Sequence, residues 1–351
     1  MKMLRQYLGN TGLLVSRAGF GVLPMGPSQL ALPLEEGAEV LLAAMQAGIN
    51  FFDTAEYYQT YPYLRRAMDL FAASGGAPDS LILSSKSLSP DYSGMMEAIE
   101  DARVQLGRDV IDIFLMHEVR SGQLEERSGA WQALVDARER GLVKAIGLST
   151  HHVDVCAAAS QIDDLDVVFP LLNYAGLGIR ITEASGNAGD AEAACGSSGV
   201  SGGSRGIERF ATADEMLGAI RLCREAGKGI YTMKAFGGGS LTSTYQKALD
   251  FVFSQPDVDA VMLGFGKKSE LDDLLSWMDG TMDPAYNPDV SKKRVRVNQE
   301  DCEGCGACRA KCASGAIFWN PENGLAEVDQ TKCITCGYCI PACPVRAMIM
   351  Y

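Results

Sequence analysis

Short apolar runs alternate with segments of helical periodicity along most of the chain. Eight runs have the length and composition of buried strands, and they lie near residues 18–22, 49–53, 81–85, 111–116, 144–148, 167–172, 229–233 and 260–263. The clearest helical segment between them is 34–49, where the apolar residues fall on one face. Ahead of the first strand, residues 5–17 predict a short hairpin, because two short runs flank a Gly/Asn turn.

Eight strands that alternate with helices within about 280 residues predict a (β/α)₈ barrel. A doubly wound parallel sheet is the alternative that this pattern leaves open. In a barrel, catalytic groups lie at the C-terminal ends of different strands, where the βα loops converge. The polar residues at the strand ends are therefore the first candidates for a site.

Ionisable side chains stand at three successive strand ends. Asp53 ends the second strand, Lys86 the third and His117 the fourth, and Tyr58 lies one loop beyond Asp53. A phenol has a pKa near ~10, so it exchanges protons near neutrality only where a cation lowers that value. A lone histidine or lysine is more often structural or solvated, but four suitable groups at neighbouring strand ends predict a catalytic site.

The segment from about Arg5 to Asp279 resembles the aldo/keto reductase superfamily. The resemblance rests on Phe52-Asp53-Thr54-Ala55-Glu56-Tyr57-Tyr58, on the strand ends at Lys86 and His117, and on residues 141–149, which lead to a serine. It implies a barrel that carries an Asp–Tyr–Lys–His tetrad and binds a nicotinamide cofactor along its mouth.

The resemblance also implies a role for each member of the tetrad. Lys86, held by Asp53, would lower the pKa of Tyr58, so that this phenol gives a proton to the substrate oxygen or takes one from it. His117 would orient the carbonyl for hydride attack. Tyr57 is a competing phenol, but the family spacing selects Tyr58. We interpret His151 and His152, which follow the fifth strand, as residues of a loop that leads into a helix.

The same resemblance implies where NADH or NADPH would lie. Residues at the ends of the fifth and sixth strands would surround the nicotinamide, residues 234–239 would pass the ribose and pyrophosphate, and residues 264–270 would bind the adenosine half. Backbone approach to phosphate needs small residues, although a glycine triplet is more often only a turn. The expected cofactor-binding residues are Ser149, Thr150, Asn173, Lys234, Phe236, Gly237, Gly264, Gly266, Lys267 and Lys268.

Glu270 departs from the family pattern, because many NADPH-dependent members have an arginine there. A carboxylate repels a 2′-phosphate and accepts a hydrogen bond from a free 2′-hydroxyl, which favours NADH. Lys267 and Lys268 oppose this preference, because either lysine can supply the missing cation.

Residues 182–209 are a second departure, with 7 Gly, 5 Ser and 5 Ala among 28 residues. This composition does not form a packed core, so we expect a structureless loop that leaves a strand end at the mouth of the barrel. A lid over cofactor or substrate and simple disorder are both open. We interpret Cys195 within this loop as an incidental thiol.

Eight of the 11 cysteines lie between Cys302 and Cys343. The spacing Cys-x₂-Cys-x₂-Cys-x₃-Cys occurs there twice with an offset of 31 residues, which is the run of bacterial ferredoxins. In such a pair, the fourth cysteine of each run ligates the cluster of the other half. One [4Fe–4S] cluster would be held by Cys302, Cys305, Cys308 and Cys343, and the other by Cys333, Cys336, Cys339 and Cys312.

Zinc ligation and disulfide bonding fit these cysteines less well than clusters do. Zinc sites usually have pairs that are more widely separated. Disulfides would imply export, and the start of the chain has no apolar signal segment. Ala313 replaces the proline that usually follows the fourth cysteine of the run, without removing a ligand. We therefore expect a barrel over residues 1–285, a linker over 286–297 and a two-cluster ferredoxin domain over 298–351.

Charge and hydropathy exclude some classes of partner. The net charge of −13 argues against binding to a nucleic-acid backbone. No uncharged apolar run reaches the ~18 residues of a membrane span. The sequence predicts a cytoplasmic protein with no nucleic-acid or membrane partner.

These features predict an oxidoreductase that interconverts a small-molecule carbonyl and an alcohol by hydride transfer with NAD(P)H. Leu23, Met25, Tyr57 and Phe236 suggest an apolar or aromatic substrate pocket. The alternative is an electron-transfer or redox-sensing protein whose barrel is a binding scaffold, which an intact tetrad argues against.

The clusters raise a separate question, because nicotinamide moves two electrons together and each cluster moves one. A flavin is the usual device that splits the pair, but nothing in the barrel sequence indicates a flavin site. We expect the clusters to exchange electrons with an external redox protein, a flavoprotein. A purely structural or docking role for the ferredoxin domain is the alternative.

Overall fold

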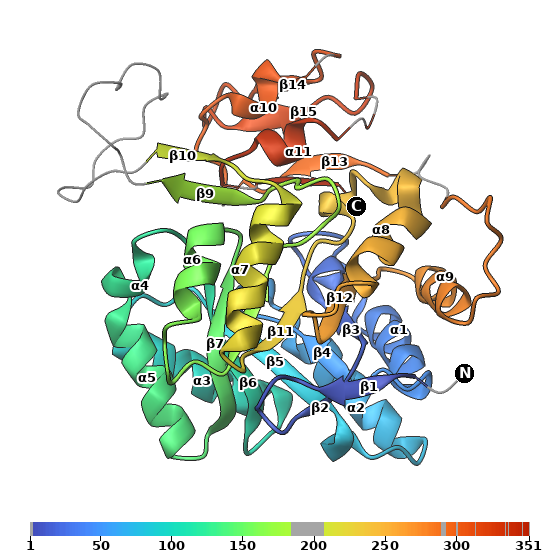
Figure 1. Cartoon of the computed structure of the whole chain (residues 1–351). Coiled ribbons are helices and arrows are strands. Elements are labelled where there is room, and N and C mark those ends of the chain that lie inside the picture. Colours follow the sequence, from blue (N-terminus) through green and yellow to red (C-terminus); the bar gives the residue numbers. More distant parts are fainter. Residues whose placement is uncertain are drawn as a thin grey trace.

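The barrel predicted from the alternating pattern is present and closed. The computed structural model describes residues 3–183, 207–288, 293–299, 301–312, 314–333, 335, 337–345 and 347–350. Eight parallel strands close in the order β11-β12-β3-β4-β5-β6-β7-β8, which rules out the doubly wound sheet. Figure 1 shows the helices outside these strands. The strands are β3 (Ala18–Gly21), β4 (Phe51–Asp53), β5 (Ile82–Ser87), β6 (Ile111–Val119), β7 (Val143–Thr150), β8 (Val167–Pro170), β11 (Gly229–Thr232) and β12 (Ala260–Gly264).

The longer helices pack around the barrel because each presents an apolar stripe to the strands. Ala38, Leu41 and Met45 are buried on one face of the first helix, as its periodicity predicts. Thr212 and Glu215 form a capping box that begins α7. The helices are α1 (Leu34–Gln46), α2 (Tyr61–Ala73), α3 (Tyr92–Leu106), α4 (Gln123–Glu126), α5 (Ser128–Glu139), α6 (Val153–Ala159), α7 (Ala213–Glu225), α8 (Tyr245–Phe253) and α9 (Lys268–Met278).

The barrel encloses a packed interior rather than a channel. Large side chains from different strands fill it, among them Phe51, Leu115, Phe169 and Tyr231. The predicted hairpin, β1 (Arg5–Tyr7) and β2 (Leu14–Ser16), adds apolar residues to this cluster at the end where the strands begin. Gly9 has a φ of +49° there, and a Cβ at this position would lie 2.3 Å from the backbone nitrogen of Gly229.

The segment expected to be a structureless loop has ordered ends, and the expectation was wrong for them. Strands β9 (Arg180–Glu183) and β10 (Ile207–Phe210) form an antiparallel pair. Cross-strand ion pairs join Arg180 to Glu208 and Arg209 to Glu183, and such pairs stabilise a ladder. Residues 184–206, including Cys195, lie outside the described residues.

A small C-terminal unit lies over the end of the barrel where the strands finish (Figure 1). It contains β13 (Val295–Val297) paired with β16 (Met348–Met350), β14 (Ile317–Trp319) paired with β15 (Ala326–Val328), and the short helices α10 (Ala307–Ala310) and α11 (Cys339–Ala342). Strand β13 lies within the segment expected to be the linker. The unit has an apolar cluster of its own, which includes Val295, Ile317 and Met348. None of the helices in the described part of the chain has the length and apolar character needed to span a bilayer.

Candidate active site

A buried ion pair lies at the mouth of the barrel. Asp53 is the last residue of β4, and Lys86 lies near the end of the neighbouring strand β5. Nζ of Lys86 donates to Oδ2 of Asp53 and to the Thr54 carbonyl, both at 2.6 Å. Burial raises the pKa of Asp53 and lowers the pKa of Lys86, while attraction between the two charges opposes both shifts.

The other two residues of the predicted tetrad lie beside this pair. Tyr58 ends the short 3₁₀ helix η2 (Glu56–Tyr58), and Nζ of Lys86 is 4.7 Å from the centre of its ring. The Tyr58 hydroxyl lies 3.3 Å from Nε2 of His117, and the two rings meet edge to face. The fold therefore brings Asp53, Tyr58, Lys86 and His117 together in one site.

A buried arginine, which sequence reasoning missed, joins the strand ends that carry this site. Arg127 precedes α5 and is 6% exposed. Its guanidinium donates to the carbonyl of His117 at 2.9 Å and to those of Ser87 and Ser89 at 3.1 and 3.3 Å. It thereby fixes the ends of β5 and β6 relative to each other, and burial lowers its pKa. An arginine in a helical segment carries no motif that would have revealed this role.

A second buried residue that the sequence did not single out is Tyr231, inside the barrel below the site. Its hydroxyl and that of Ser84 are 2.7 Å apart, and its ring stacks on Phe169 with centroids 4.0 Å apart. Desolvation and the charge of Asp53 raise the pKa of Tyr231, so this phenol stays neutral. Phe169 also lies under the ammonium of Lys86, at 5.5 Å.

The three side chains expected around the nicotinamide are buried at adjoining strand ends and bond to the backbone. Oγ of Ser149 accepts from the amide of Glu118 at 2.8 Å, and Thr150 donates to the carbonyl of Val119 at 2.7 Å. Asn173 donates to the carbonyl of Leu177 at 3.0 Å and accepts from its amide at 2.9 Å. Their contact with a cofactor stays a prediction.

The glycine loop after β11 is in contact with the C-terminal unit. Gly238 and Gly239, in η4 (Gly237–Gly239), have φ of +71° and +97°. A Cβ at Gly238 would lie 3.1 Å from Cγ2 of Ile340, and one at Gly239 would lie 3.2 Å from Cβ of Met350. The C-terminal unit therefore covers the side of Gly238 and Gly239 on which a side chain would project.

Phe236 and Lys234 belong to the same loop. The ring of Phe236 stacks on Tyr245 with centroids 5.0 Å apart. Burial lowers the pKa of Lys234, and the charges of Glu118 and Asp301 oppose that shift. Since Asp301 belongs to the C-terminal unit, Lys234 lies where the two parts of the chain meet.

The segment expected at the adenosine half begins α9. Glu270 accepts a hydrogen bond from the amide of Gly266 at 2.8 Å, and Lys268 pairs with Asp272 at 2.7 Å. A Cβ at Gly264 would lie 2.6 Å from Pro24, and Lys267 occupies the N-cap of the helix. The carboxylate of Glu270 is thus engaged by its own helix terminus.

Residues of η2 and β9 at the mouth bond to the C-terminal unit. The Tyr57 hydroxyl donates to Asp301 at 3.0 Å and accepts from Asn298 at 2.7 Å. Arg180 donates to the carbonyl of Cys343 at 3.3 Å. Tyr57, expected to line an apolar pocket, is therefore a contact between the two parts of the chain.

A cavity of about 240 Å³ lies between the two parts, and its lining is mostly charged. Residues at or just beyond the ends of β6 and β7 and residues of the β9–β10 pair meet the C-terminal unit there, and the apolar substrate pocket suggested by Leu23, Met25 and Phe236 stays a prediction. The lining residues are Glu118, Arg120, His152, Arg180, Glu208, Glu303, Pro344 and Val345. His152 is also the N-cap of α6, as expected of a residue that leads into a helix.

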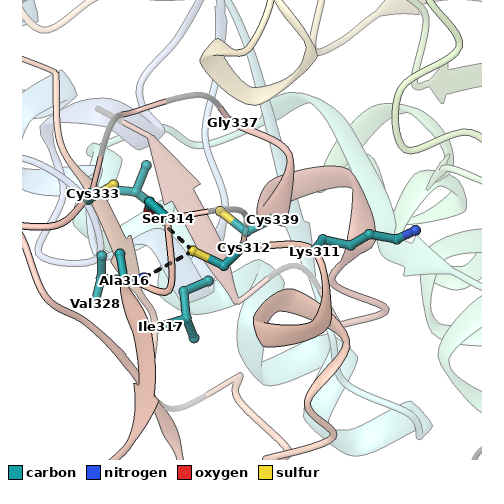
Figure 2. A pocket seen from close by; sticks show the side chains of 10 residues that line it. Lys311, Cys312, Ser314, Ala316, Ile317, Val328, Cys333, Gly337 and Cys339 are labelled. Atoms are coloured by element: carbon teal, nitrogen blue, oxygen red, sulfur yellow. Dashed lines mark hydrogen bonds between the residues drawn. The ribbon is translucent and has the colours of Figure 1, made fainter.

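The described cysteines of the C-terminal unit lie in two groups, and their ligation of clusters stays a prediction. Burial and the neighbouring thiols of Cys343, Cys302 and Cys305 raise the pKa of Cys308 to about 11, so these four lie together. Cys312, Cys333 and Cys339 line one small cavity, shown in Figure 2. Cys336, the fourth expected member of that set, lies outside the described residues.

This arrangement suits cluster ligands. The first set joins three cysteines of the first run to the last cysteine of the second, and the second set contains the reverse combination. Ser314 and the amide of Ala316 lie near Cys312 Sγ, the latter at 3.2 Å, and an N–H group there stabilises a thiolate. Among the described residues, no three His, Cys, Asp or Glu side chains form a group that would hold a single metal ion.

Family comparisons divide the chain in the same way. Residues 18–181 match the model of the aldo/keto reductase family, and residues 294–344 match the model of a 4Fe-4S dicluster domain. The first match contains the whole tetrad together with Ser149, Thr150 and Asn173. The glycine loop and the start of α9 lie beyond it.

Curated relatives match part of the barrel. An aldo-keto reductase of Mycobacterium avium (strain 104) is 30% identical over 176 residues, which is 50% of this chain and 58% of that protein. A 2,5-diketo-D-gluconic acid reductase B of Corynebacterium sp. is 35% identical over 118 residues, 33% of this chain and 41% of the relative. The chain thus spans about half the length of these relatives.

Solved structures show the same fold. A putative aldo-keto reductase from Pseudomonas aeruginosa superposes with a TM-score of 0.60 at 22% identity, over 80% of this chain and 96% of that one. An aldo-keto reductase from Bacillus halodurans, solved in a holo form, has a TM-score of 0.58 at 15% identity, over 81% and 93% of the two chains. These likenesses extend the barrel comparison beyond the family match.

Proposed function

We propose that this chain, which joins an N-terminal aldo/keto reductase domain to a C-terminal 4Fe-4S dicluster domain, interconverts a carbonyl and an alcohol at the mouth of its barrel. The observation that carries the proposal is the convergence of Asp53, Tyr58, Lys86 and His117.

In the proposed reduction, the carbonyl carbon accepts a hydride and its oxygen accepts a proton from the Tyr58 hydroxyl. His117, 3.3 Å from that hydroxyl, donates to the same oxygen and aligns the carbonyl. Lys86 stabilises the phenolate that the proton leaves behind, because its ammonium lies against the ring. Asp53 holds Lys86 in place, and the reverse steps oxidise an alcohol.

NAD(P)H, when bound, supplies the hydride in this proposal. Ser149, Thr150 and Asn173 would hold the nicotinamide, because they end β7 and follow β8 beside the tetrad. The carboxylate of Glu270 at the start of α9 favours NADH, since it repels a 2′-phosphate, whereas Lys267 and Lys268 beside it favour NADPH. The names of further curated relatives, which include a methylglyoxal reductase and a D-threo-aldose 1-dehydrogenase, support a small carbonyl or alcohol as substrate.

The proposal is tested by supplying the purified protein with NADH or NADPH and a panel of aldehydes and ketones. Oxidation of the dinucleotide in equal amount to the alcohol formed supports it. If the dinucleotide binds but no carbonyl of the panel is reduced, the chain is a cofactor-binding scaffold, the second candidate function. The clustered tetrad favours the enzyme.

The proposed partner of the clusters is an external flavoprotein, because a flavin passes single electrons to a cluster and pairs to a nicotinamide. The test reduces the clusters with dithionite, removes the excess and adds carbonyl substrate without dinucleotide. Alcohol formation as the clusters reoxidise would contradict an external partner. Clusters that stay reduced until an oxidised flavoprotein is added would support it.

A further inference from the structure

The loop that the family resemblance assigns to the pyrophosphate is the loop on which the dicluster domain rests. Gly238 faces Ile340 and Gly239 faces Met350, at the contact distances given above. A Cβ at Gly337 would lie 2.7 Å from Oγ of Ser240, and Ser240 donates to the Gly337 carbonyl at 3.5 Å. The loop and the domain are therefore in direct contact on this side of the glycines.

A phosphate bound by backbone amides needs the small residues of such a loop to face it directly. In this chain, those same residues face α11 and β16 of the dicluster domain. Their positive φ values and close contacts explain the glycines through packing alone. We infer that an extended dinucleotide and the dicluster domain compete for the side of Gly238 and Gly239 that contacts Ile340 and Met350. Binding of the dinucleotide to this side then requires the domain to move away from the barrel.

The dicluster domain has an apolar cluster of its own and small contacts with the barrel, so it can move as a unit. Among the residues that the structure describes, its apolar cluster, which includes Val295 and Met348, shares no buried residue with the clusters of the barrel. The contacts between the two parts described above are small apolar contacts and a few hydrogen bonds, two of which involve the Tyr57 hydroxyl. Two further ones join Arg296 to the carbonyl of Pro27 at 3.1 Å and Lys293 to Thr242 at 3.2 Å.

Competition has a thermodynamic consequence for affinity. When a ligand binds only the undocked state, its apparent dissociation constant rises by the factor by which that state is depleted. Weakening the docking contacts therefore tightens dinucleotide binding without touching the dinucleotide site. This inference rests on the proposed use of NAD(P)H.

The test compares two double variants of the full chain with the wild type. Ile340→Ala with Arg296→Ala removes one apolar and one cationic contact with the barrel. Phe318→Ala with Lys332→Ala removes the same kinds of side chain from exposed positions of the same domain. Iron content and the visible absorption of the clusters establish that each protein is loaded, and dinucleotide affinity is measured by calorimetry.

We expect the first variant to bind the dinucleotide roughly tenfold more tightly than the wild type, and the control variant to match the wild type. Equal affinities in all three proteins, or weaker binding by the first variant, would overturn the competition alone. Absence of binding in all three would overturn the nicotinamide part of the proposed function, and the competition with it.

If the first variant loses its iron, a measurement on the wild type replaces the comparison of affinities. Small-angle X-ray scattering is recorded with and without saturating dinucleotide. Competition requires the radius of gyration to rise as the domain leaves the barrel. An unchanged or smaller radius at saturation would overturn the inference.

Discussion

Tyr57 and Tyr58 are adjacent in the chain, yet their hydroxyl groups contact different domains. The Tyr58 oxygen lies 3.3 Å from Nε2 of His117 in the barrel, whereas the Tyr57 hydroxyl donates to Asp301 of the dicluster domain at 3.0 Å. Both belong to the one-turn helix η2. A shift of the domain is therefore transmitted directly to the helix that holds the proposed proton donor.

Replacing Tyr58 with Phe should lower the rate of carbonyl reduction by a factor of ~10²–10⁴, because the ring remains and the transferable proton is lost. Dinucleotide affinity should stay nearly constant. Steady-state kinetics and calorimetry provide the two measurements. Tyr92→Phe, which removes an exposed hydroxyl bonded to Asp136, is the matched control. Near-normal turnover of the Tyr58 variant would remove this residue from the mechanism.

Arg127 is expected to act as a positioning residue. Replacing it with Ala leaves the carbonyls of His117 and Ser87 without their donor, which should cost about 1–3 kcal/mol of unfolding free energy. Misalignment of the tetrad should lower kcat by ~10²-fold with little change in KM. Added guanidinium should restore part of kcat. If kcat and the unfolding free energy both fall and guanidinium restores no activity, the role of Arg127 is purely structural.

The capping box of α7 predicts a pH-dependent difference in stability. Arg209 and the cap of Thr212 lower the pKa of Glu215 to about 2. A lowered carboxylate pKa contributes stability above the unfolded value near ~4.3, and that contribution is lost as pH falls towards the folded value. Glu215→Gln should therefore have a lower Tm than the wild type at neutral pH, and the difference should shrink below pH ~4. A constant difference across this range, measured by circular dichroism, would contradict the assignment.

Crossed ligation makes a specific prediction for Cys312. The loaded protein should contain close to eight irons, as expected for two [4Fe–4S] clusters. Cys312→Ser should perturb the cluster assigned to Cys333, Cys336 and Cys339, since Cys312 lines a cavity with two of them, Cys333 and Cys339. Electron paramagnetic resonance of the reduced protein distinguishes the two clusters. Damage confined to the cluster of Cys302, Cys305 and Cys308 would show that the crossing is wrong.

The barrel and the site could be predicted because their signals are local. Each strand is a short apolar run, and Asp53, Lys86 and His117 follow from counting to the strand ends, where a barrel collects its functional groups. The β9–β10 pair was missed because glycine and serine dominate the segment, while the pairing depends on charged residues at its two ends, such as Arg180 and Glu208.

Contacts between distant segments left no such signal. Arg127 bonds to backbone carbonyls, and a carbonyl acceptor has no sequence signature. The bond from Tyr57 to Asp301 joins residues 244 positions apart, with neither periodicity nor spacing to indicate it. The resemblance predicts that the glycines of residues 237–239 lie beside a pyrophosphate. The structure shows that Gly238 and Gly239 also pack against the dicluster domain, which is a second reason for glycine there.

The grouping of Cys343 with Cys302, Cys305 and Cys308 sets an order of events during synthesis. Because domains fold as they emerge from the ribosome, every strand of the barrel is available for folding before Cys343 has been translated. The first three thiols of that set are therefore made before the fourth, and β13 is made before its pairing strand β16. The newly made barrel therefore passes through a period in which its mouth is uncovered, until β16 has been translated and pairs with β13 in the unit that lies over this face.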